Sequence, residues 1–173
     1  ADDYVITNAH VVAGTQTVRL DTKLGLKDAT VVYYNPEVDI AVLRAPDLGI
    51  QPLPWAQQPA QTGDDAMVMG FPHSGPFNAE MARVRDRITI AGPDIYSQGR
   101  VERDSYTVRG NIQQGNSGGP LVNTAGEVLG VIFGASVDDS ETGYALTADE
   151  VIGHIGDVTQ LQRPVETGEC VAH

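Results

Sequence analysis

The sequence predicts an all-β sandwich or barrel followed by one short C-terminal helix. Short apolar runs recur at spacings of about ten residues, and glycines and prolines fall between them. The chain of 173 residues holds 19 glycines and 10 prolines, which suits a turn-rich β protein better than a helical one. Apolar residues make up 41% of the chain, enough for a packed core. A helix-capping pattern appears near the end of the chain.

The expected strands are the apolar runs between these breaks. They are residues 4–7, 16–20, 29–34, 40–44, 66–70, 82–90, 105–109, 121–122, 128–133 and 144–147. A tight turn and a short helical piece are expected at residues 8–12, and a Pro-rich connector at 45–59. The capping box at residues 147–150 precedes Val151, Ile152 and Ile155 at helical spacing, which predicts the terminal helix.

Charge and composition exclude several classes of partner. The formal net charge of −12 argues against nucleic acid, because binding to phosphates needs clustered lysines and arginines. The lack of a basic patch also argues against an anionic membrane surface. No apolar stretch approaches the roughly 18 residues that span a bilayer. There is no cluster of His and Cys that would bind a metal.

The most informative segment is Gly-Asn-Ser-Gly-Gly-Pro at residues 115–120. A nucleophilic serine needs its hydroxyl on a sharp turn, with backbone N–H groups facing the oxygen that becomes negative during attack. Gly115 can adopt a conformation that turns its own N–H inward, which a Cβ would hinder. Ser117 is therefore the candidate nucleophile, and the N–H groups of Gly115 and Ser117 form the candidate oxyanion hole. The alternative is a glycine-rich β-turn.

A serine nucleophile needs a base, and His10 is the candidate, in Thr-Asn-Ala-His-Val-Val at residues 7–12. Asp39 precedes the apolar run 40–43, where an aspartate is unusual unless a partner satisfies it. A carboxylate that accepts the Nδ1–H of His10 fixes the tautomer of the ring and stabilises its cationic form. Taken singly, His10 is also compatible with a core residue and Asp39 with a surface turn.

These three segments, in this order, resemble the trypsin-fold serine peptidases, and among them the HtrA/DegP-like bacterial branch most closely. That family shows a Thr-Asn-Ala-His-Val-Val type segment, then an Asp-Ile-Ala-Val-Leu type segment, then Gly-Asn-Ser-Gly-Gly-Pro. The order His, Asp, Ser separates it from subtilisin-like and α/β-hydrolase enzymes. Residues 126–131 resemble the strand that follows the nucleophile in that family. The resemblance covers nearly the whole chain.

The resemblance implies a fold of two packed antiparallel β-barrels with a short C-terminal helix. It divides the chain into an N-terminal barrel with the connector, residues 1–58, and a C-terminal barrel with the terminal helix, residues 59–173. The family's opening strand would precede Tyr4 and is not in this chain, so the N-terminal barrel is expected to be incomplete. His10 is the triad member most at risk from this loss.

The activity implied is that of a serine endopeptidase, which hydrolyses peptide bonds through an acyl-enzyme. His10, Asp39 and Ser117 would form the catalytic triad, with no metal or cofactor, and the substrate would be a protein or peptide. Two alternatives remain: a catalytically inactive, peptide-binding form of the same fold, and an esterase with the same triad.

Substrate preference is expected to depend on Asn111. In the trypsin fold, the residue six before the nucleophile lies near the base of the primary pocket, and here that residue is Asn111. A neutral amide offers no buried charge to Arg or Lys, so no strong basic preference is expected. Ile132 and Phe133 either flank this pocket or fill the core.

Three further segments, at residues 63–72, 91–96 and 167–170, resemble membrane-anchored periplasmic proteases of mycobacteria and their relatives. This resemblance implies an anchor in a missing N-terminal region and a role in resistance to acid and oxidative stress. It also implies a disulfide from Cys170, the single cysteine, to a cysteine upstream of the first strand. The start at Ala1, without initiator Met or signal peptide, agrees with a segment of a longer protein. The alternative for Cys170 is a free thiol on a flexible tail.

Overall fold

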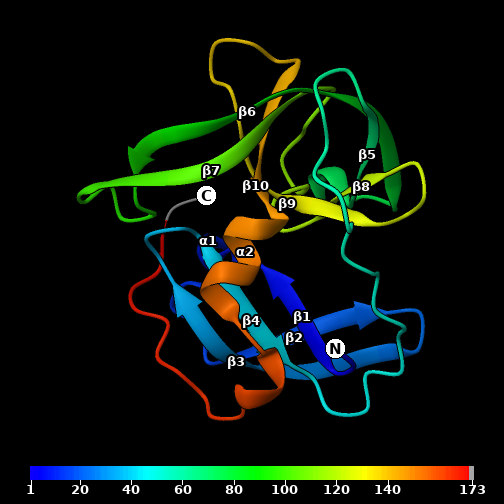
Figure 1. Cartoon of the computed structure of the whole chain (residues 1–173). Coiled ribbons are helices and arrows are strands. Elements are labelled where there is room, and N and C mark those ends of the chain that lie inside the picture. Colours follow the sequence, from blue (N-terminus) through cyan, green and yellow to red (C-terminus); the bar gives the residue numbers. More distant parts are fainter. Residues whose placement is uncertain (172–173) are drawn as a thin grey trace. The chain divides into compact units, whose positions relative to one another are not determined.

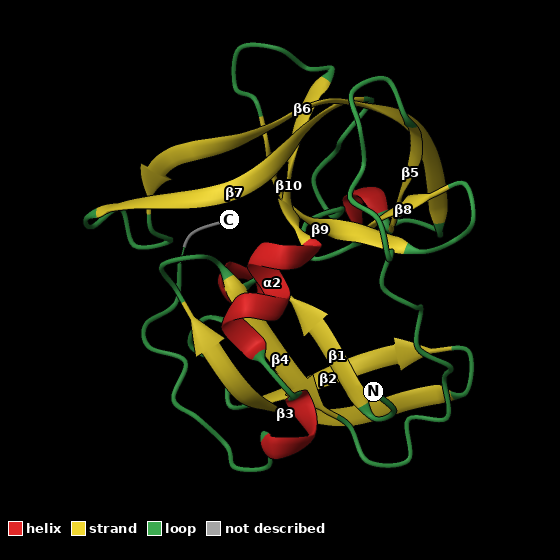
Figure 2. Cartoon of the chain, in the orientation of Figure 1, coloured by secondary structure: helices red, strands yellow, loops and turns green. Residues whose placement is uncertain are grey.

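The computed structural model describes residues 1–171, which form two compact units (Figure 1). The first unit contains Ala1–Pro52, Gly92–Val101 and the chain from Ile155 onward. The second unit contains Leu53–Ala91 and Glu102–His154. Both units are built mainly of antiparallel strands, as Figure 2 shows, so the all-β prediction is confirmed.

The first unit contains an open four-stranded antiparallel sheet in the order β1-β4-β3-β2. Its strands are β1 (Tyr4–Thr7), β2 (Thr17–Thr22), β3 (Gly25–Asn35) and β4 (Ile40–Arg44). Residues 40–43 of the inner strand β4 are all buried, which explains their unbroken apolar sequence. The two edges of the sheet are β1 and β2, so the sheet does not close. The resemblance implied an incomplete barrel in this part of the chain.

Helix α1 (Ala9–Val12) is a single turn between β1 and β2. Its buried residue Val12 joins a core formed with Ala29, Val31, Ala41, Leu43, Ala45 and Leu48. The C-terminal tail also belongs to this unit, because the N–H of Val165 donates to the backbone oxygen of Val31 on β3 at 3.0 Å. A short 3-10 turn, η2 (Val158–Gln160), opens the tail.

The second unit contains a closed barrel in the order β10-β7-β6-β5-β8-β9. Its strands are β5 (Asp65–Gly70), β6 (Asn78–Pro93), β7 (Arg100–Arg109), β8 (Pro120–Asn123), β9 (Val128–Ala135) and β10 (Thr142–Thr147). The last two residues of β6 and the first two of β7 belong to the first unit. The core of the barrel consists of Ala66, Val68, Ala82, Val84, Tyr106, Val108, Leu121, Leu129, Ile132 and Ala145. The buried hydroxyl of Tyr106 accepts the N–H of Ala60 at 3.0 Å, so this polar group is satisfied.

Helix α2 (Ala148–Ile155) follows β10, as the capping pattern predicts. The hydroxyl of Thr147 accepts the N–H of Glu150 at 3.1 Å and donates to Asp104 at 2.9 Å. Val151 and Ile155 are buried one turn apart, whereas Ile152 is exposed. None of the helices within residues 1–171 is long and apolar enough to cross a membrane. The loop after β5 contains a short 3-10 turn, η1 (Pro72–Ser74).

Candidate active site

His10 on α1 and Asp39 before β4 are joined by two hydrogen bonds within the first unit. The ring Nδ1 of His10 lies 2.6 Å from Oδ2 of Asp39, and the backbone N–H of His10 donates to Oδ1 at 2.9 Å. A carboxylate can only accept, so Nδ1 carries a hydrogen, and in the neutral ring Nε2 is then the nitrogen with the lone pair. This is the arrangement of an imidazole oriented to act as a base.

A tight turn holds Asp39 in place. The side chain of Asn35 accepts the N–H groups of Glu37 at 3.1 Å and Val38 at 3.3 Å, and the N–H of Asp39 donates to the Asn35 backbone oxygen at 3.0 Å. Asp39 has a left-handed φ of 68°, which aspartate tolerates better than most residues. The buried amide of Asn8 donates to the Asp39 backbone oxygen at 3.0 Å. Asp39 is therefore fixed through both its main chain and its side chain.

Ser117 lies in the second unit, in the loop between β7 and β8. Gly115 of this loop has φ +100°, and a Cβ there would lie 2.5 Å from the oxygen of Phe71 and 3.0 Å from the nitrogen of His73. The N–H of His73 donates to the oxygen of Gln114 at 2.8 Å, which holds the two loops together. Only glycine fits at position 115, as the sequence analysis expects.

The amides of this loop divide into two groups. The N–H of Asn116 donates to the oxygen of Gln113 at 3.1 Å, and the N–H of Gly118 donates to the oxygen of Ile132 at 2.8 Å. Within residues 1–171, the N–H groups of Gly115 and Ser117 donate to no protein acceptor. Two such amides beside a serine are the donors that an oxyanion hole requires.

Asn111 is exposed and lines an open pocket of about 420 Å³ in the second unit. The other lining residues are Arg109, Gly110, Ser140 and Glu141. The Glu141 carboxylate in this lining is 3.3 Å from the Arg109 guanidinium, so its charge is already paired.

The two other predicted pocket residues have different surroundings. Ile132 is fully buried in the barrel core, so of its two expected roles it fills the core. Its backbone oxygen accepts the N–H of Gly118. Phe133 is half-buried, with its ring centroid 6.3 Å from that of Tyr144 and 5.6 Å from the guanidinium carbon of Arg103. The Phe133 ring thus contributes an aromatic and cation–π contact within the second unit.

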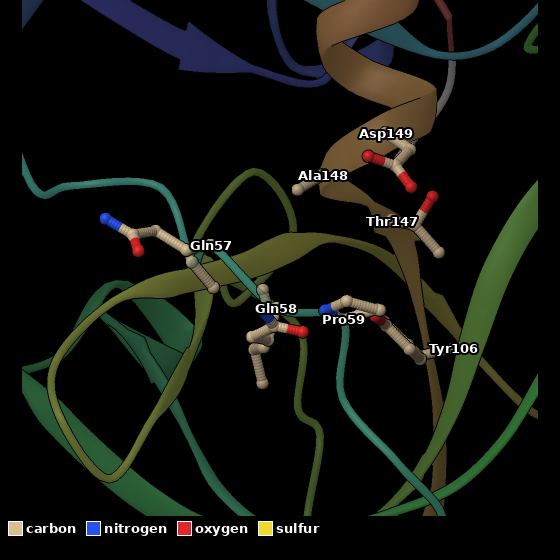
Figure 3. Close-up of a pocket in the computed structure, with 9 residues that line it drawn as sticks. Gln57, Gln58, Pro59, Tyr106, Thr147, Ala148 and Asp149 are labelled. Atoms are coloured by element: carbon tan, nitrogen blue, oxygen red, sulfur yellow. The ribbon is translucent and has the colours of Figure 1, made fainter.

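A second pocket lies at the start of α2 and is shown in Figure 3. Thr147 and Asp149 line one side of it, and Gln57 to Pro59 line the other. Its volume of about 50 Å³ is far below the roughly 300–1,000 Å³ of ordinary ligand pockets, and none of the predicted site residues lines it. In the part of the chain that the structure describes, no cluster of His, Cys, Asp and Glu side chains is suited to hold a metal ion.

Cys170 has a free, exposed thiol. Its backbone nitrogen and Cα would lie 3.0 and 3.1 Å from a Cβ on Gly14, so the tail runs close to the end of α1. The Tyr96 hydroxyl donates to the backbone oxygens of Thr167 at 3.3 Å and Glu169 at 3.1 Å. Around Cys170 the tail is therefore tied to the first unit by hydrogen bonds.

The sequence suggests no role for Asn8, Tyr96 or Thr167. In the structure Asn8 binds Asp39, Thr167 binds the residues that follow α1, and Tyr96 binds the tail at Thr167. Asn8 offers a signal, because a polar residue among apolar neighbours needs a buried partner. Thr167 offers none, because its hydroxyl binds a backbone oxygen far along the chain. Tyr96 offers none either, because its partners are backbone oxygens of the tail and the hydroxyl of Tyr34, 62 positions away.

Comparison with known proteins gives consistent matches. A family model described as a trypsin-like peptidase domain matches residues 1–131. The chain is 50% identical over 171 residues to the serine protease Rv3671c of Mycobacterium tuberculosis, covering 98% of this chain and 43% of that protein. It is 31% identical over 136 residues to a probable periplasmic serine endoprotease, DegP-like, of Chlamydia pneumoniae, covering 75% and 26%. The chain thus spans less than half the length of these relatives.

A solved structure agrees with these matches. The active form of the Rv3671c protease from M. tuberculosis has a TM-score of 0.95 to this chain at 48% identity. That match covers 99% of this chain and 76% of the other. The predicted family and fold are confirmed: the chain belongs to the trypsin-like peptidase domain family.

Proposed function

We propose that this chain is the protease domain of a serine endopeptidase with His10, Asp39 and Ser117 as its catalytic triad. The observation that carries the proposal is the pair of hydrogen bonds from His10 to the Asp39 carboxylate. A buried carboxylate that holds an imidazole in one tautomer is what general-base activation of a serine needs. Membership of the peptidase family supports the same assignment.

In the proposed reaction, Nε2 of His10 takes the proton from Oγ of Ser117 as that oxygen bonds to the scissile carbonyl carbon. The carbonyl oxygen becomes negative, and the N–H groups of Gly115 and Ser117 stabilise it by about 3 kcal/mol per donor. His10 then protonates the leaving nitrogen, and the C–N bond breaks to give an acyl-enzyme. A water that His10 deprotonates attacks the ester, which releases the acid and returns the proton to Ser117.

The substrates we propose are proteins or peptides without a required basic residue at the cleavage site. Asn111 is neutral, and the carboxylate of Glu141 in the same pocket is paired with Arg109. A cationic side chain would therefore find no unpaired carboxylate among the residues that line this pocket.

The direct test is replacement of the proposed nucleophile. Ser117→Ala is expected to abolish hydrolysis of a peptide library and to lose labelling by a fluorophosphonate probe. The matched control is Ser97→Gly, an exposed serine whose φ of 58° suits glycine, and it is expected to keep both activities. Labelling of another serine would overturn the assignment. Peptide binding without cleavage by the unaltered chain would instead identify the inactive, peptide-binding form.

We further propose that the parent protein is a membrane-anchored protease whose protease domain lies in the bacterial periplasm or cell envelope and acts in resistance to acid and oxidative stress. The segments at 63–72, 91–96 and 167–170 and the DegP-like relative named periplasmic support this. The test is to express the full-length gene in its bacterium with Ser117→Ala as the control. The unaltered protein is expected to be found in the membrane fraction, and its expression is expected to restore survival in acid and peroxide. Equal survival with Ser117→Ala would contradict the proposal.

We propose, finally, that Cys170 forms a disulfide with a cysteine of the parent protein that lies upstream of this chain. Its exposed thiol supports this, because a partner from outside the chain can reach it. Peptide mapping of the full-length protein without reductant is expected to find Cys170 in a cross-linked peptide. Recovery of Cys170 only as the free thiol under oxidising conditions would contradict it.

A further inference from the structure

Helix α1, which carries the proposed base His10, cannot maintain its own position. It is four residues long, and a single helical turn is unfavourable in water. Asn8 at its N-cap makes no side-chain capping bond. Its side-chain N–H donates to the backbone oxygen of Asp39, and within residues 1–171 its Oδ1 accepts no hydrogen bond. The two bonds from His10 to Asp39 secure the N-terminal half of the turn. Its C-terminal end needs a separate support.

The C-terminal tail provides that support. The N–H of Gly14 donates to the backbone oxygen of Thr167 at 3.0 Å. In return, the hydroxyl of Thr167 donates to the backbone oxygen of Thr15. The hydroxyl of Thr15 donates to the oxygen of Val12, the last residue of α1, at 2.6 Å. A continuous series of hydrogen bonds therefore joins Thr167 to the end of the helix.

Thr167 is the buried residue of an otherwise exposed segment. It is 4% exposed, whereas residues 162–166 and 168–170 are all exposed. The apolar Val165 nearby is 37% exposed, so apolar burial does not explain why the tail lies here. The anchor is instead a polar side chain whose hydroxyl and carbonyl are both satisfied by the residues that follow α1.

Tyr96 binds the tail at Thr167, and Tyr34 binds Tyr96. The Tyr96 hydroxyl donates to the backbone oxygens of Thr167 at 3.3 Å and Glu169 at 3.1 Å. It also lies 2.6 Å from the hydroxyl of Tyr34. Carbonyl oxygens can only accept, so the single Tyr96 hydrogen is shared between the two oxygens of the tail and Tyr34 is the donor to Tyr96. Burial and this hydrogen bond raise the pKa of Tyr34, so its hydroxyl stays protonated. Tyr34 lies on β3 opposite Ala41 of β4, so the series ends on the sheet.

We propose that Thr167, held by Tyr96, is a positioning residue for His10. It fixes the C-terminal end of α1, as Asp39 fixes the N-terminal half, and the two together set the direction of the imidazole. The effect on catalysis rests on the proposed serine-protease function. The effect on the position of His10 does not, because all of these contacts lie within the first unit.

The test uses Thr167→Val, which removes the hydroxyl at nearly constant volume, and Tyr96→Phe. Both are expected to slow labelling of Ser117 by a fluorophosphonate by about 10- to 100-fold, since a displacement of about 1 Å can cost about 100-fold. For a peptide substrate, kcat per folded molecule, with the folded fraction measured by circular dichroism, is expected to fall with KM unchanged. Thr167→Ser, which keeps the hydroxyl, is expected to restore most of the rate.

The matched control is Tyr4→Phe, because the Tyr4 hydroxyl also donates to a backbone oxygen of the tail, at Leu161 and 3.1 Å. It is expected to change the labelling rate by less than about twofold, since Leu161 makes no contact in the series that ends at α1. If Thr167→Val and Tyr96→Phe label as fast as Tyr4→Phe, the proposal is wrong.

A second measurement separates this proposal from the proposed function. The Nδ1–H of His10, bound to Asp39, is expected to give a sharp downfield proton resonance in the unaltered chain and in Tyr4→Phe. That resonance is expected to broaden in Thr167→Val and Tyr96→Phe. A chain that is never labelled but shows this pattern would disprove the protease activity and retain the positioning role. An unchanged resonance in both variants would overturn the positioning role itself.

Discussion

Asp39 receives two hydrogen bonds from His10, one from its backbone N–H at 2.9 Å and one from its ring Nδ1 at 2.6 Å. The first bond attaches the helix that carries His10 to the turn before β4, and the second orients the ring. Both acceptor oxygens belong to a carboxylate that is only 5% exposed, so water competes weakly for them. One residue therefore fixes both the place and the direction of the proposed base.

Asp39→Asn is expected to lower kcat/KM for a peptide substrate by about 10⁴-fold. The amide can present an N–H group to Nδ1, which favours the tautomer that carries its hydrogen on Nε2 and cannot accept the serine proton. The measurement is steady-state kinetics beside a circular dichroism spectrum. The control is Asp28→Asn. The Asp28 carboxylate is exposed and lies 3.6 Å from Arg19, so this substitution is expected to leave kcat/KM unchanged. Similar rates for the two variants would exclude the proposed role of Asp39.

Gly115→Ala is expected to reduce labelling of Ser117 by at least about 100-fold, the cost of losing one oxyanion donor. The added Cβ would lie 2.5 Å from the Phe71 oxygen, so the loop has to move and the Gly115 N–H turns away. The control is Gly126→Ala, where φ is also positive at 79° but no atom lies within 4 Å of the added Cβ. It is expected to cost about 1 kcal/mol of stability and to retain the labelling rate. Equal labelling rates would show that Gly115 does not shape the site.

The second unit contains a pH-sensitive ion-pair network around Asp104. Nη2 of Arg87 lies 2.5 Å from Asp104 and 3.1 Å from Asp149, and the Thr147 hydroxyl donates to Asp104 at 2.9 Å. The hydrogen bond from Arg87 chiefly lowers the pKa of Asp104, and the one from Thr147 adds to it. A lowered folded-state pKa stabilises the protein above the ordinary pKa of aspartate. This stability is lost as the pH falls through the folded-state value.

Asp104→Asn is therefore expected to lower the free energy of unfolding at pH 7 by about 1 kcal/mol, a modest value because the pair is partly exposed. The difference from the unaltered chain is expected to shrink as the pH falls below about 4, where Asp104 becomes protonated in the unfolded chain. It is expected to be lost at the lower pH at which Asp104 is protonated in the folded chain as well. Urea unfolding at a series of pH values measures this. Asp65→Asn, in the more exposed pair with Arg83, is the control and is expected to change stability by less than about 0.5 kcal/mol. A difference that grows in acid would contradict the account.

Asn111→Asp is expected to increase cleavage after Arg and Lys relative to apolar residues by about tenfold or more. It adds an unpaired carboxylate to a pocket where Glu141 is already paired with Arg109. Profiling of a peptide library before and after the substitution measures the change. An unchanged profile would show that Asn111 does not line the primary pocket.

The sequence predicts some elements of the fold much better than others. The ends of β1 and β4 agree with the observed ones, because β4 is an unbroken buried run that a turn bounds. The expected strand at 82–90 is shorter than β6, which begins at Asn78. At 78–81 the polar Asn78 and Glu80 are half-buried and Met81 is exposed, the reverse of the usual alternation.

The site divides in the same way. The sequence predicts Ser117 and Gly115 as site residues, and these assignments stay predictions, because the chemistry requires a local backbone conformation and that conformation requires glycine. Asp39 is predictable because a carboxylate beside an apolar strand needs a partner. The support from Thr167 is not predictable, because it joins residues 152 positions apart through the backbone oxygen of Thr15. Such a contact leaves no pattern of side chains in the sequence.

The most direct test of the triad is mass spectrometry of the chain after reaction with a fluorophosphonate, with and without His10→Ala. We predict a single adduct that maps to Ser117 in the unaltered chain, and labelling at least about 100-fold slower in His10→Ala. An adduct on any other serine, or an equal rate in the two proteins, would contradict the catalytic assignment.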